Sequence, residues 1–435
     1  MPQADLNRAG MSRREWTVVA LLVFSVVINY VDRSNLSLTV PILEKQFSIS
    51  SLQAGELLGA FSWTYALAQL FGLSGWLADR FHAGWVLFGG YLLWCLATAL
   101  AGVASGFVTL FAVLLLLGLG ESVAYPCYSR IFAAMPQSHR GRANALIDAG
   151  TKLGPAAGAF VGGIVLIHFG WRTLFVAFGI GALVWLPLWY WVMPTGGASD
   201  APDPTEETHE KENARPTGDP SPSILTILRL PCAWGAFIGH FCGNYFYYFL
   251  LTWLPTYLVQ EEHLSIRAMS RLTSAVFVVI ASSTLVCGFA SDWLIARGAS
   301  PSIVRRTLAS GGLVLASTLI LFSMVHGRPT LALGLLALAC VGQGAYASNH
   351  WAITQTLAGP RMAGRWSSLQ NGFANFSGVV APWLTGLIVQ TRGSARLAFA
   401  VTGFVALIGG LSWGLLVRRV EQVDWEALAA GRSAA

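Results

Sequence analysis

The sequence predicts an all-α polytopic membrane protein with twelve transmembrane helices arranged as two pseudo-symmetric six-helix bundles. Three observations predict this class. Of the 435 residues, 54% are hydrophobic and 11% are charged, whereas a soluble domain has about 25% charged residues. The apolar residues form runs of about 20, the length at which a helix crosses a hydrocarbon core of about 30 Å. A polar, proline-rich segment over 194–225 divides these runs into two sets of six.

Each apolar run is continuous enough to be a helix, and only helices and closed barrels span lipid. The first run is not a cleavable signal peptide, because it is long and contains Asn29, Asp32 and Arg33. The 46 glycines suit close packing between helices in lipid. In chain order, the predicted spans are about 16–38, 54–77, 84–104, 108–133, 143–168, 173–192, 230–258, 270–296, 306–325, 330–356, 364–390 and 397–417.

The interruption between the two sets is predicted to be a disordered cytoplasmic linker over 194–228. Six prolines and seven of the 21 acidic residues lie within 194–225, and such a segment cannot bury apolar surface. This leaves an N-terminal lobe over 1–193, a C-terminal lobe over 229–420 and a cytoplasmic tail over 421–435. The segments predicted to be cytoplasmic hold 18 Lys and Arg residues and the outer loops hold 7, which places both termini in the cytoplasm.

The two halves look like parallel copies of one another. Gly118 precedes Pro136 by 18 residues, and Gly342 precedes Pro360 by the same interval. The motif Gly75–Arg80, which follows the second span, has a looser counterpart after the second span of the other half. Parallel six-helix halves fit the two-lobe plan of transporters, in which the substrate site lies between the lobes near the middle of the membrane.

Several motifs distributed over nearly the whole chain carry a family resemblance. They are Asn29–Ser37, Gly75–Arg80, Gly120-Glu121, Gly170-Trp171-Arg172, Leu251–Pro255, Ser348-x-His350-Trp351, and Asn371 with Asn375. With them the chain resembles the major facilitator superfamily and, more narrowly, the anion:cation symporter family, which includes bacterial hexuronate and galactonate permeases and animal vesicular glutamate and sialic acid transporters. The resemblance implies the major facilitator fold and a proton-coupled symporter that imports a sugar acid, a hexuronate or an aldonate, by alternating access. The alternative is a transporter of another carboxylate, proton-coupled or facilitative, or an anion exporter.

Five ionisable residues are predicted to lie within the spans: Asp32, Arg33, Glu121, Asp148 and Lys152. A charge at mid-membrane costs at least about 2.5–3.5 kcal/mol, so these groups are expected to face a shared aqueous cavity. Three acids and two bases nearly balance. One anionic substrate together with one or two protons would keep the site close to neutral, as proton-coupled anion symport requires.

The first half of the chain supplies the expected proton carriers and the substrate anchor. Asp32 and Glu121 are the predicted proton-coupling residues; for Glu121 this is also what the resemblance implies. Arg33 is the predicted anchor for the substrate carboxylate, because a guanidinium offers a fixed fork of donors. Tyr30 and Tyr65 would donate to substrate hydroxyls or pack as aromatics. The structural alternatives are that Asp32 pairs permanently with a base such as Arg33, and that Glu121 only ties two helices together.

One position departs from the family pattern. Relatives of this kind often carry an arginine seven residues before the acid of the fourth span, where this chain has Leu114. A positive charge stands instead at Lys152 in the fifth span. We expect Lys152 to take over part of the anion-binding role. The alternative is a structural pair with Asp148, which lies four residues earlier on the same helix face.

The second half has neutral polar residues rather than charges at the span centres. Ser348, Trp351 and Asn371 are the predicted substrate-binding residues of this half, where they would bind the substrate's hydroxyls. His350 could titrate, although a neutral, hydrogen-bonded histidine is the simpler expectation.

The motif after the second span is expected to act as a gate. Asp79 would meet Arg130, Arg140 or Arg142 when the inner side is closed, and the predicted gating residues are Asp79, Arg80, Arg140, Arg142 and Asp292. Ala83, Gly84 and Trp85 stand where basic residues are usual, which weakens the expected latch.

Enzymatic and nucleic-acid-binding functions find no support in the sequence. The histidines form no HExxH pair, the six cysteines show no CxxC spacing, and neither a GxSxG elbow nor a P-loop occurs. No enzyme activity, metal or organic cofactor is expected, and the coupling ion is the proton. The expected partners are a small organic anion, protons and membrane lipid, with no nucleic acid. The protein is expected to be a monomer in the inner (plasma) membrane of a cell.

Overall fold

The computed structural model describes residues 12–133, 135, 137–193, 224–325, 327–425 and 428. These residues form seventeen helices and no strand. The first half contains α2 (Arg13–Phe47), α3 (Ser51–Leu70), α4 (Leu73–Arg80), α5 (Ala83–Ala101), α6 (Phe107–Ser122), α7 (Ala124–Ala133), α8 (Gln137–Ala182) and α9 (Trp185–Val192). The second half contains α11 (Ile224–Leu228), α12 (Pro231–Gln260), α13 (Ile266–Ala296), α14 (Pro301–Ala316), α15 (Leu319–Met324), α16 (Pro329–Ala347), α17 (His350–Asn375), α18 (Ser377–Arg392) and α19 (Arg396–Leu415).

Helix ends and predicted span ends do not coincide, because several spans are interrupted or joined. The second span is divided into α3 and α4 at Gly72, whose φ is 70°. Conversely, α8 runs through the fifth span into the sixth, and the chain turns within it at Gly170 with φ 79°. A similar turn at Gly359, with φ 63°, joins the tenth and eleventh spans within α17. These left-handed conformations favour glycine.

Nine helical stretches among the described residues are long and apolar enough to cross a membrane. One of them, Leu146–Val192, contains the fifth and sixth predicted spans. The second and seventh spans, in α3–α4 and α12, are not among the nine. Both are rich in Gly, Tyr and Trp, and most of α12 is buried against other helices.

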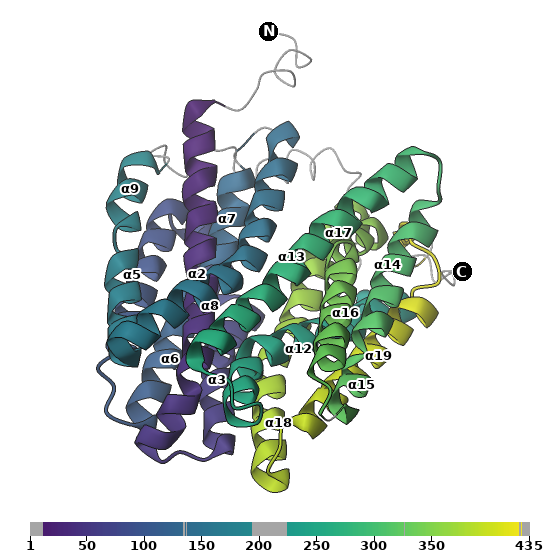
Figure 1. The fold of residues 1–435 in the computed structure, drawn as a ribbon. Helices are drawn as coiled ribbons and strands as arrows, with labels where there is room; N and C mark the ends of the chain where they lie inside the picture. The colour runs from purple at the N-terminus through teal and green to yellow at the C-terminus, as the bar shows by residue number, and fades with distance from the viewer. Residues whose placement is uncertain are drawn as a thin grey trace.

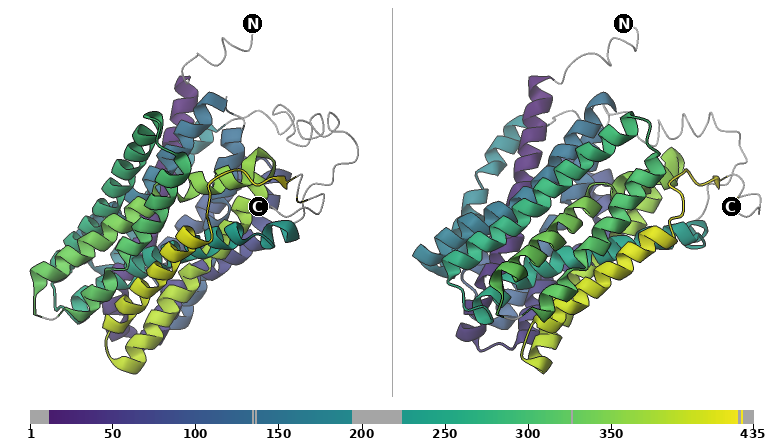
Figure 2. Two further views of the ribbon diagram at one scale, coloured as in Figure 1. Left: turned by 90° about the vertical axis from the view of Figure 1, so that its right-hand side faces the viewer. Right: turned by 45° about the vertical axis from the view of Figure 1, so that its right-hand side comes forward.

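The helices form two lobes, shown from purple to blue for the first half and from teal to yellow for the second half (Figure 1). Between the lobes, α3 packs against α18, α8 packs against α13, and α2 packs against α12. Under the parallel repeat, the second and fifth spans correspond to the eighth and eleventh. The contact of α8 with α13 is therefore the repeat-related copy of the contact of α3 with α18. Figure 2 shows α13 lying obliquely along the first lobe.

The lobes approach most closely at one end, which we call the distal end: the end that holds the loops 48–50, 261–265 and 393–395. A Cβ atom added to Gly55 of α3 would lie 2.5 Å from the Pro382 carbonyl oxygen of α18. A Cβ atom added to Gly163 of α8 would lie 2.1 Å from the Ser270 hydroxyl oxygen of α13. Glycine at these two positions lets the helix backbones meet. The distal end is therefore closed.

The structure shows ordered segments at the end of the predicted linker and at the start of the predicted tail. The last five residues of the predicted linker form α11, and residues 194–223 lie outside the described part. At the start of the predicted tail, the Val423 amide donates to the Leu357 carbonyl at 3.0 Å. The Trp425 indole donates to the Ala358 carbonyl at 2.9 Å. Residues 423–425 therefore pack on α17.

Candidate functional site

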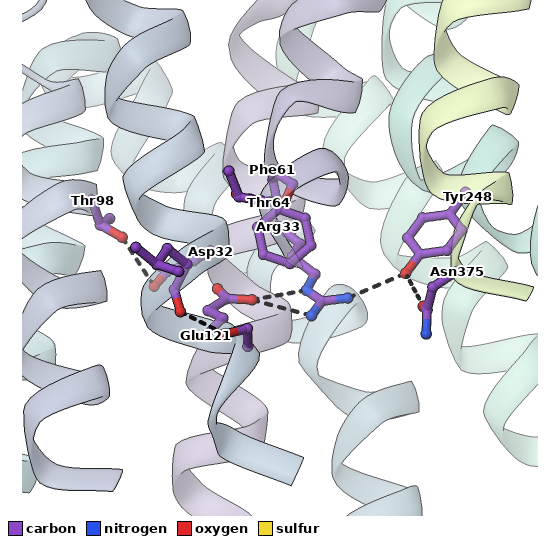
Figure 3. A network of polar contacts seen from close by, with 10 residues as sticks. Asp32, Arg33, Phe61, Thr64, Thr98, Glu121, Tyr248 and Asn375 are labelled. Carbon is purple, nitrogen blue, oxygen red and sulfur yellow. Dashed lines mark hydrogen bonds and ion pairs between the residues drawn. The ribbon is translucent and has the colours of Figure 1, made fainter. Parts of the chain in front are cut away.

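Arg33 lies at the centre of a buried polar cluster between the lobes. Its Nε and Nη2 atoms donate to Oε2 of Glu121 at 3.2 and 3.1 Å. Its Nη1 atom donates to the Tyr248 hydroxyl at 3.4 Å. The side chains of Arg33 and Glu121 are 6% and 0% exposed. Figure 3 shows the guanidinium between Glu121 of the first lobe and Tyr248 of the second.

Three aromatic rings of the first lobe surround the same guanidinium. The Cζ atom of Arg33 lies 4.7 Å from the ring centroid of Tyr30, 4.3 Å from that of Phe61 and 5.1 Å from that of Tyr65. Such cation–π contacts stabilise a desolvated cation. The predicted substrate residues Tyr30 and Tyr65 therefore lie around the predicted anchor, and Phe61 joins them.

Two glycines of α6 bring Glu121 to the centre of the lobe. A Cβ atom on Gly118 would lie 2.2 Å from the Phe61 carbonyl oxygen of α3, and one on Gly120 would lie 2.9 Å from the Gly90 carbonyl oxygen of α5. Because neither glycine has a side chain, α3 and α5 pack directly on the last turns of α6. The carboxylate of Glu121 is thereby fixed against α2.

Asp32 is buried beside this cluster and has no ion-pair partner among the described residues. Its Oδ2 atom accepts a hydrogen bond from the Thr98 hydroxyl at 3.3 Å, and its Oδ1 atom has no hydrogen-bond partner there. A cavity of about 40 Å³ is lined by residues that include Asp32, Arg33, Leu114 and Tyr248. It has room for at least one water. The alternative that Arg33 neutralises Asp32 is not observed, because the partner of Arg33 is Glu121.

The three ionisable groups of the cluster do not balance. Two carboxylates and one guanidinium carry a net charge of −1 when all are ionised, and an uncompensated buried charge is costly. The cluster of Asp32, Arg33 and Glu121 is therefore neutral when it holds one proton. A substrate carboxylate that joined it would require a second proton.

Tyr248 connects the cluster to the second lobe. Its hydroxyl donates to Oδ1 of Asn375 at 3.3 Å, and the Asn375 amide donates to the Asn371 carbonyl at 2.9 Å. Neither Tyr248 nor Asn375 is among the substrate-binding residues predicted from the sequence. The spacing of His240, Asn244 and Tyr248, four residues apart on one helix, could have indicated a polar face of α12 toward the centre.

Lys152 has no hydrogen bond or ion pair to the Arg33 cluster among the described residues and lies at a second contact between the lobes. Its Nζ atom is 3.6 Å from Oδ1 of Asp148, whose side chain is 52% exposed, and 5.7 Å from the ring centroid of Tyr247 in α12. The Tyr247 hydroxyl donates to the Thr151 carbonyl at 3.2 Å. The predicted Asp148–Lys152 pair is therefore present, but an exposed pair of this kind contributes little. The role of Lys152 in anion binding stays a prediction.

The predicted substrate residues of the second lobe lie around α16 and α17. The Ser348 hydroxyl donates to the Ala345 carbonyl at 2.7 Å. The Trp351 ring lies 5.0 Å from His240 and 5.2 Å from His350, measured between centroids. Asn371 is linked to the Arg33 cluster through Asn375, whereas Ser348 and Trp351 have no hydrogen bond to it among the described residues.

The predicted gating residues are only partly brought together. Arg130 Nη1 lies 3.9 Å from Oδ1 of Asp79, which is 72% exposed. Arg80 and Asp292 are exposed, and in the described part of the chain no ion pair involves Asp292. The side chains of the remaining predicted gating residues, Arg140 and Arg142, lie outside the described part.

The chain matches the family model of the Major Facilitator Superfamily over residues 22–373. It is 30% identical to the “Probable galactarate/D-glucarate transporter GudP” of Escherichia coli (strain K12), over 96% of each protein. It is 28% identical to the “Hexuronate transporter” of Bacillus subtilis (strain 168), over 94% of this chain and 96% of that protein. Among solved structures, a bacterial homolog of the human lysosomal transporter Spinster, inward-facing and occupied, has a TM-score of 0.76 at 18% identity, with 94% of this chain and 98% of that chain covered. The last similarity concerns the fold alone.

Proposed function

Because the chain belongs to the Major Facilitator Superfamily, we propose that it is a proton-coupled symporter that imports a sugar acid. The family predicted from the sequence is confirmed, and the protein is a multi-pass membrane transporter of organic anions rather than an enzyme. Proton coupling, the direction of transport and the class of acid are the proposed part.

The observation that carries the proposal is the fork of hydrogen bonds from Arg33 to a single oxygen of Glu121. A guanidinium that holds one carboxylate in this way can hold another, because the recognised group is the same. Protonation of Glu121 would remove its charge and release the donors of Arg33 to the carboxylate of the substrate. Proton and anion then bind together, which is the basis of symport.

The surroundings of Arg33 support a hydroxylated acid. Tyr30, Tyr65 and Tyr248 bring three phenol groups to the guanidinium, and a phenol hydroxyl both donates and accepts. A substrate whose carboxylate binds Arg33 would place its first hydroxyls among these groups. The relatives named above, which are transporters of galactarate or D-glucarate and of hexuronates, support the same class.

The orientation of the lobes completes the proposed cycle. With both termini in the cytoplasm, the closed distal end faces outward, and the opposite end faces the cytoplasm. Rocking of the lobes about the central cluster would open the distal end and admit substrate and protons together. We place the protein as a monomer in an inner membrane.

Uptake into proteoliposomes tests the proposal. D-galactonate, D-glucuronate, D-glucarate and, as an acid without hydroxyls, adipate are offered with and without an inward proton gradient. We expect the gradient to drive accumulation of at least one sugar acid and Arg33→Ala to abolish it. Uptake that reaches the same level without a gradient would remove the proton coupling and leave a facilitative transporter. If none of the sugar acids is transported, the proposed substrate class is wrong.

A further inference from the structure

The second lobe holds a pair of buried histidines that the proposed mechanism does not use. His240 of α12 and His350 of α17, here called the histidine pair, have ring centroids 4.8 Å apart and are 3% and 7% exposed. A buried polar ring normally has a partner for each nitrogen. The hydrogen-bond partners of the two Nδ1 atoms therefore determine what the two Nε2 atoms can bind.

The neighbours of His240 determine which of its nitrogens carries the proton. The Trp366 indole, which can only donate, lies 3.1 Å from Oε1 of Gln370. That contact fixes the orientation of the amide, so Nε2 of Gln370 faces Nδ1 of His240 at 3.3 Å and donates to it. Nδ1 of His240 is therefore an acceptor, and the ring proton lies on Nε2.

The neighbours of His350 lead to the opposite assignment. Its Nδ1 atom lies 3.1 Å from the Ala347 carbonyl oxygen, and a carbonyl can only accept, so Nδ1 carries the proton. The Nε2 atom of neutral His350 is therefore an acceptor. The histidine pair thus offers one N–H donor and one nitrogen acceptor side by side. Neither Nε2 atom has a hydrogen-bond partner among the residues that the structure describes.

The pair is held rigidly and lies near the contact between the lobes. The His350 ring stacks on Tyr346 with centroids 4.9 Å apart, and Trp351 packs on both imidazoles. His240 lies two turns from Tyr248 on the same face of α12, and the Tyr248 hydroxyl accepts from Arg33 of the first lobe at 3.4 Å. This shared face places the histidine pair beside the space between the lobes, where the substrate is proposed to bind.

We propose that the histidine pair is a hydroxyl-binding subsite for the part of the substrate remote from Arg33. One hydroxyl group can accept from Nε2–H of His240 and donate to Nε2 of His350, which satisfies both orphan atoms at once. A carboxylate, which only accepts when ionised, cannot donate to His350. The inference rests on the proposed function and adds that the pair selects polyhydroxylated acids over acids of the same length without hydroxyls.

The test compares matched competitors on His350→Phe, which keeps a ring of similar shape for Tyr346 and Trp351 but removes the acceptor. Inhibition constants are measured for D-glucarate against adipate, and for D-galactonate against 6-deoxy-D-galactonate, on uptake of the sugar acid that the wild type transports. Loss of one hydrogen bond to a neutral hydroxyl should raise the inhibition constant of the hydroxylated competitor about 3- to 10-fold. The inhibition constant of the competitor that lacks the critical hydroxyl should change less than twofold in at least one of the two pairs.

The controls separate a local effect from misfolding. His168→Phe alters an exposed histidine of α8 that contacts Phe169 and should leave all constants unchanged. Should His350→Phe fold poorly, His240→Phe removes the donor of the same subsite and should lower the same preference. Equal weakening of both members of every pair, or no change, would overturn the inference. Wild type that transports no sugar acid would instead refute the proposed function.

Discussion

Replacement of Glu121 by glutamine tests the coupling of protons to the anion most directly. The change preserves the size of a side chain that is fully buried and keeps an oxygen for the two donors of Arg33. It removes one of the two carboxylates of the central cluster. We assign the proton of the empty cluster to Asp32, whose Oδ1 atom has no hydrogen-bond partner among the described residues, and the proton that enters with the substrate to Glu121. With Asp32 still protonated, the substrate carboxylate alone neutralises Arg33 in the variant, so we expect Glu121→Gln to transport one proton fewer with each substrate molecule.

The magnitude follows from the two hydrogen bonds at 3.1 and 3.2 Å. A hydrogen bond to a charged group contributes about 1.5–3 kcal/mol; a bond between two charged groups lies near the upper end of this range, and the guanidinium–amide bond of the variant, with one charged partner, lies near the lower end. The two bonds together therefore contribute about 2 kcal/mol less to holding Arg33 in the variant. Since about 1.4 kcal/mol is a factor of ten, substrate should bind the variant roughly 30-fold more tightly at alkaline pH, where Glu121 of the wild type is ionised and competes.

The accumulation ratio in proteoliposomes measures the loss of a proton. With the membrane potential held at zero, each coupled proton multiplies the ratio by about ten for every pH unit of gradient. A gradient of one unit should therefore accumulate substrate about tenfold less in Glu121→Gln than in the wild type. Exchange of labelled for unlabelled substrate, which needs no net proton movement, should continue.

A matched control is Glu44→Gln, which alters an acid on α2 that accepts from Gln260 at the distal end. It should leave the accumulation ratio unchanged. If Glu121→Gln accumulates substrate as strongly as the wild type at zero potential, the charge balance assigned to the cluster is wrong and Glu121 only ties α6 to α2.

Three further changes have expected outcomes. Arg33→Lys replaces the fork of donors by a single ammonium, so substrate affinity should fall at least about tenfold; unchanged binding would contradict the anchor role. Gly55→Ala places a methyl group against the Pro382 carbonyl and should disfavour closure of the distal end by about 1–3 kcal/mol. The effect would be seen as greater labelling of cysteines introduced at the distal end. Gly59→Ala, whose added methyl group would lie at an ordinary contact distance of 3.5 Å, should not increase the labelling. Lys152→Gln should weaken anion binding several-fold; if affinity and proton coupling are unchanged in liposomes, Lys152 is structural.

Most of the fold could be predicted from hydropathy, and its interruptions could not. A run of apolar residues shows that a segment crosses lipid, but it does not reveal where the helix breaks within the run. The division at Gly72 and the turns at Gly170 and Gly359 depend on local backbone conformation, and glycine is too frequent in this chain to mark them. The packing of 423–425 on α17 could not be predicted either, because it depends on contacts between segments far apart in the sequence.

The ionisable residues of the site could be predicted because charges are rare inside a membrane. Which of these residues pair with one another could not be predicted. Arg33 follows Asp32 directly, yet its partner is Glu121, 88 positions away, because α3 and α5 pack on α6 at Gly118 and Gly120 and hold Glu121 within reach of Arg33. The neutral members of the site are harder to recognise, since residues such as Tyr248 occur often in helices and only their spacing hints at a shared face.

The closure at Gly55 and Gly163 has a consequence for the conditions under which the protein can work. Opposed main chains and one hydroxyl carry no net charge, so dissolved electrolyte cannot screen the contact that they make. Swings in salinity outside the cell should therefore leave these two contacts equally tight. Acidity can act at this end through Glu44, which accepts from Gln260 of the other lobe, and deeper in the molecule through the ions around Arg33.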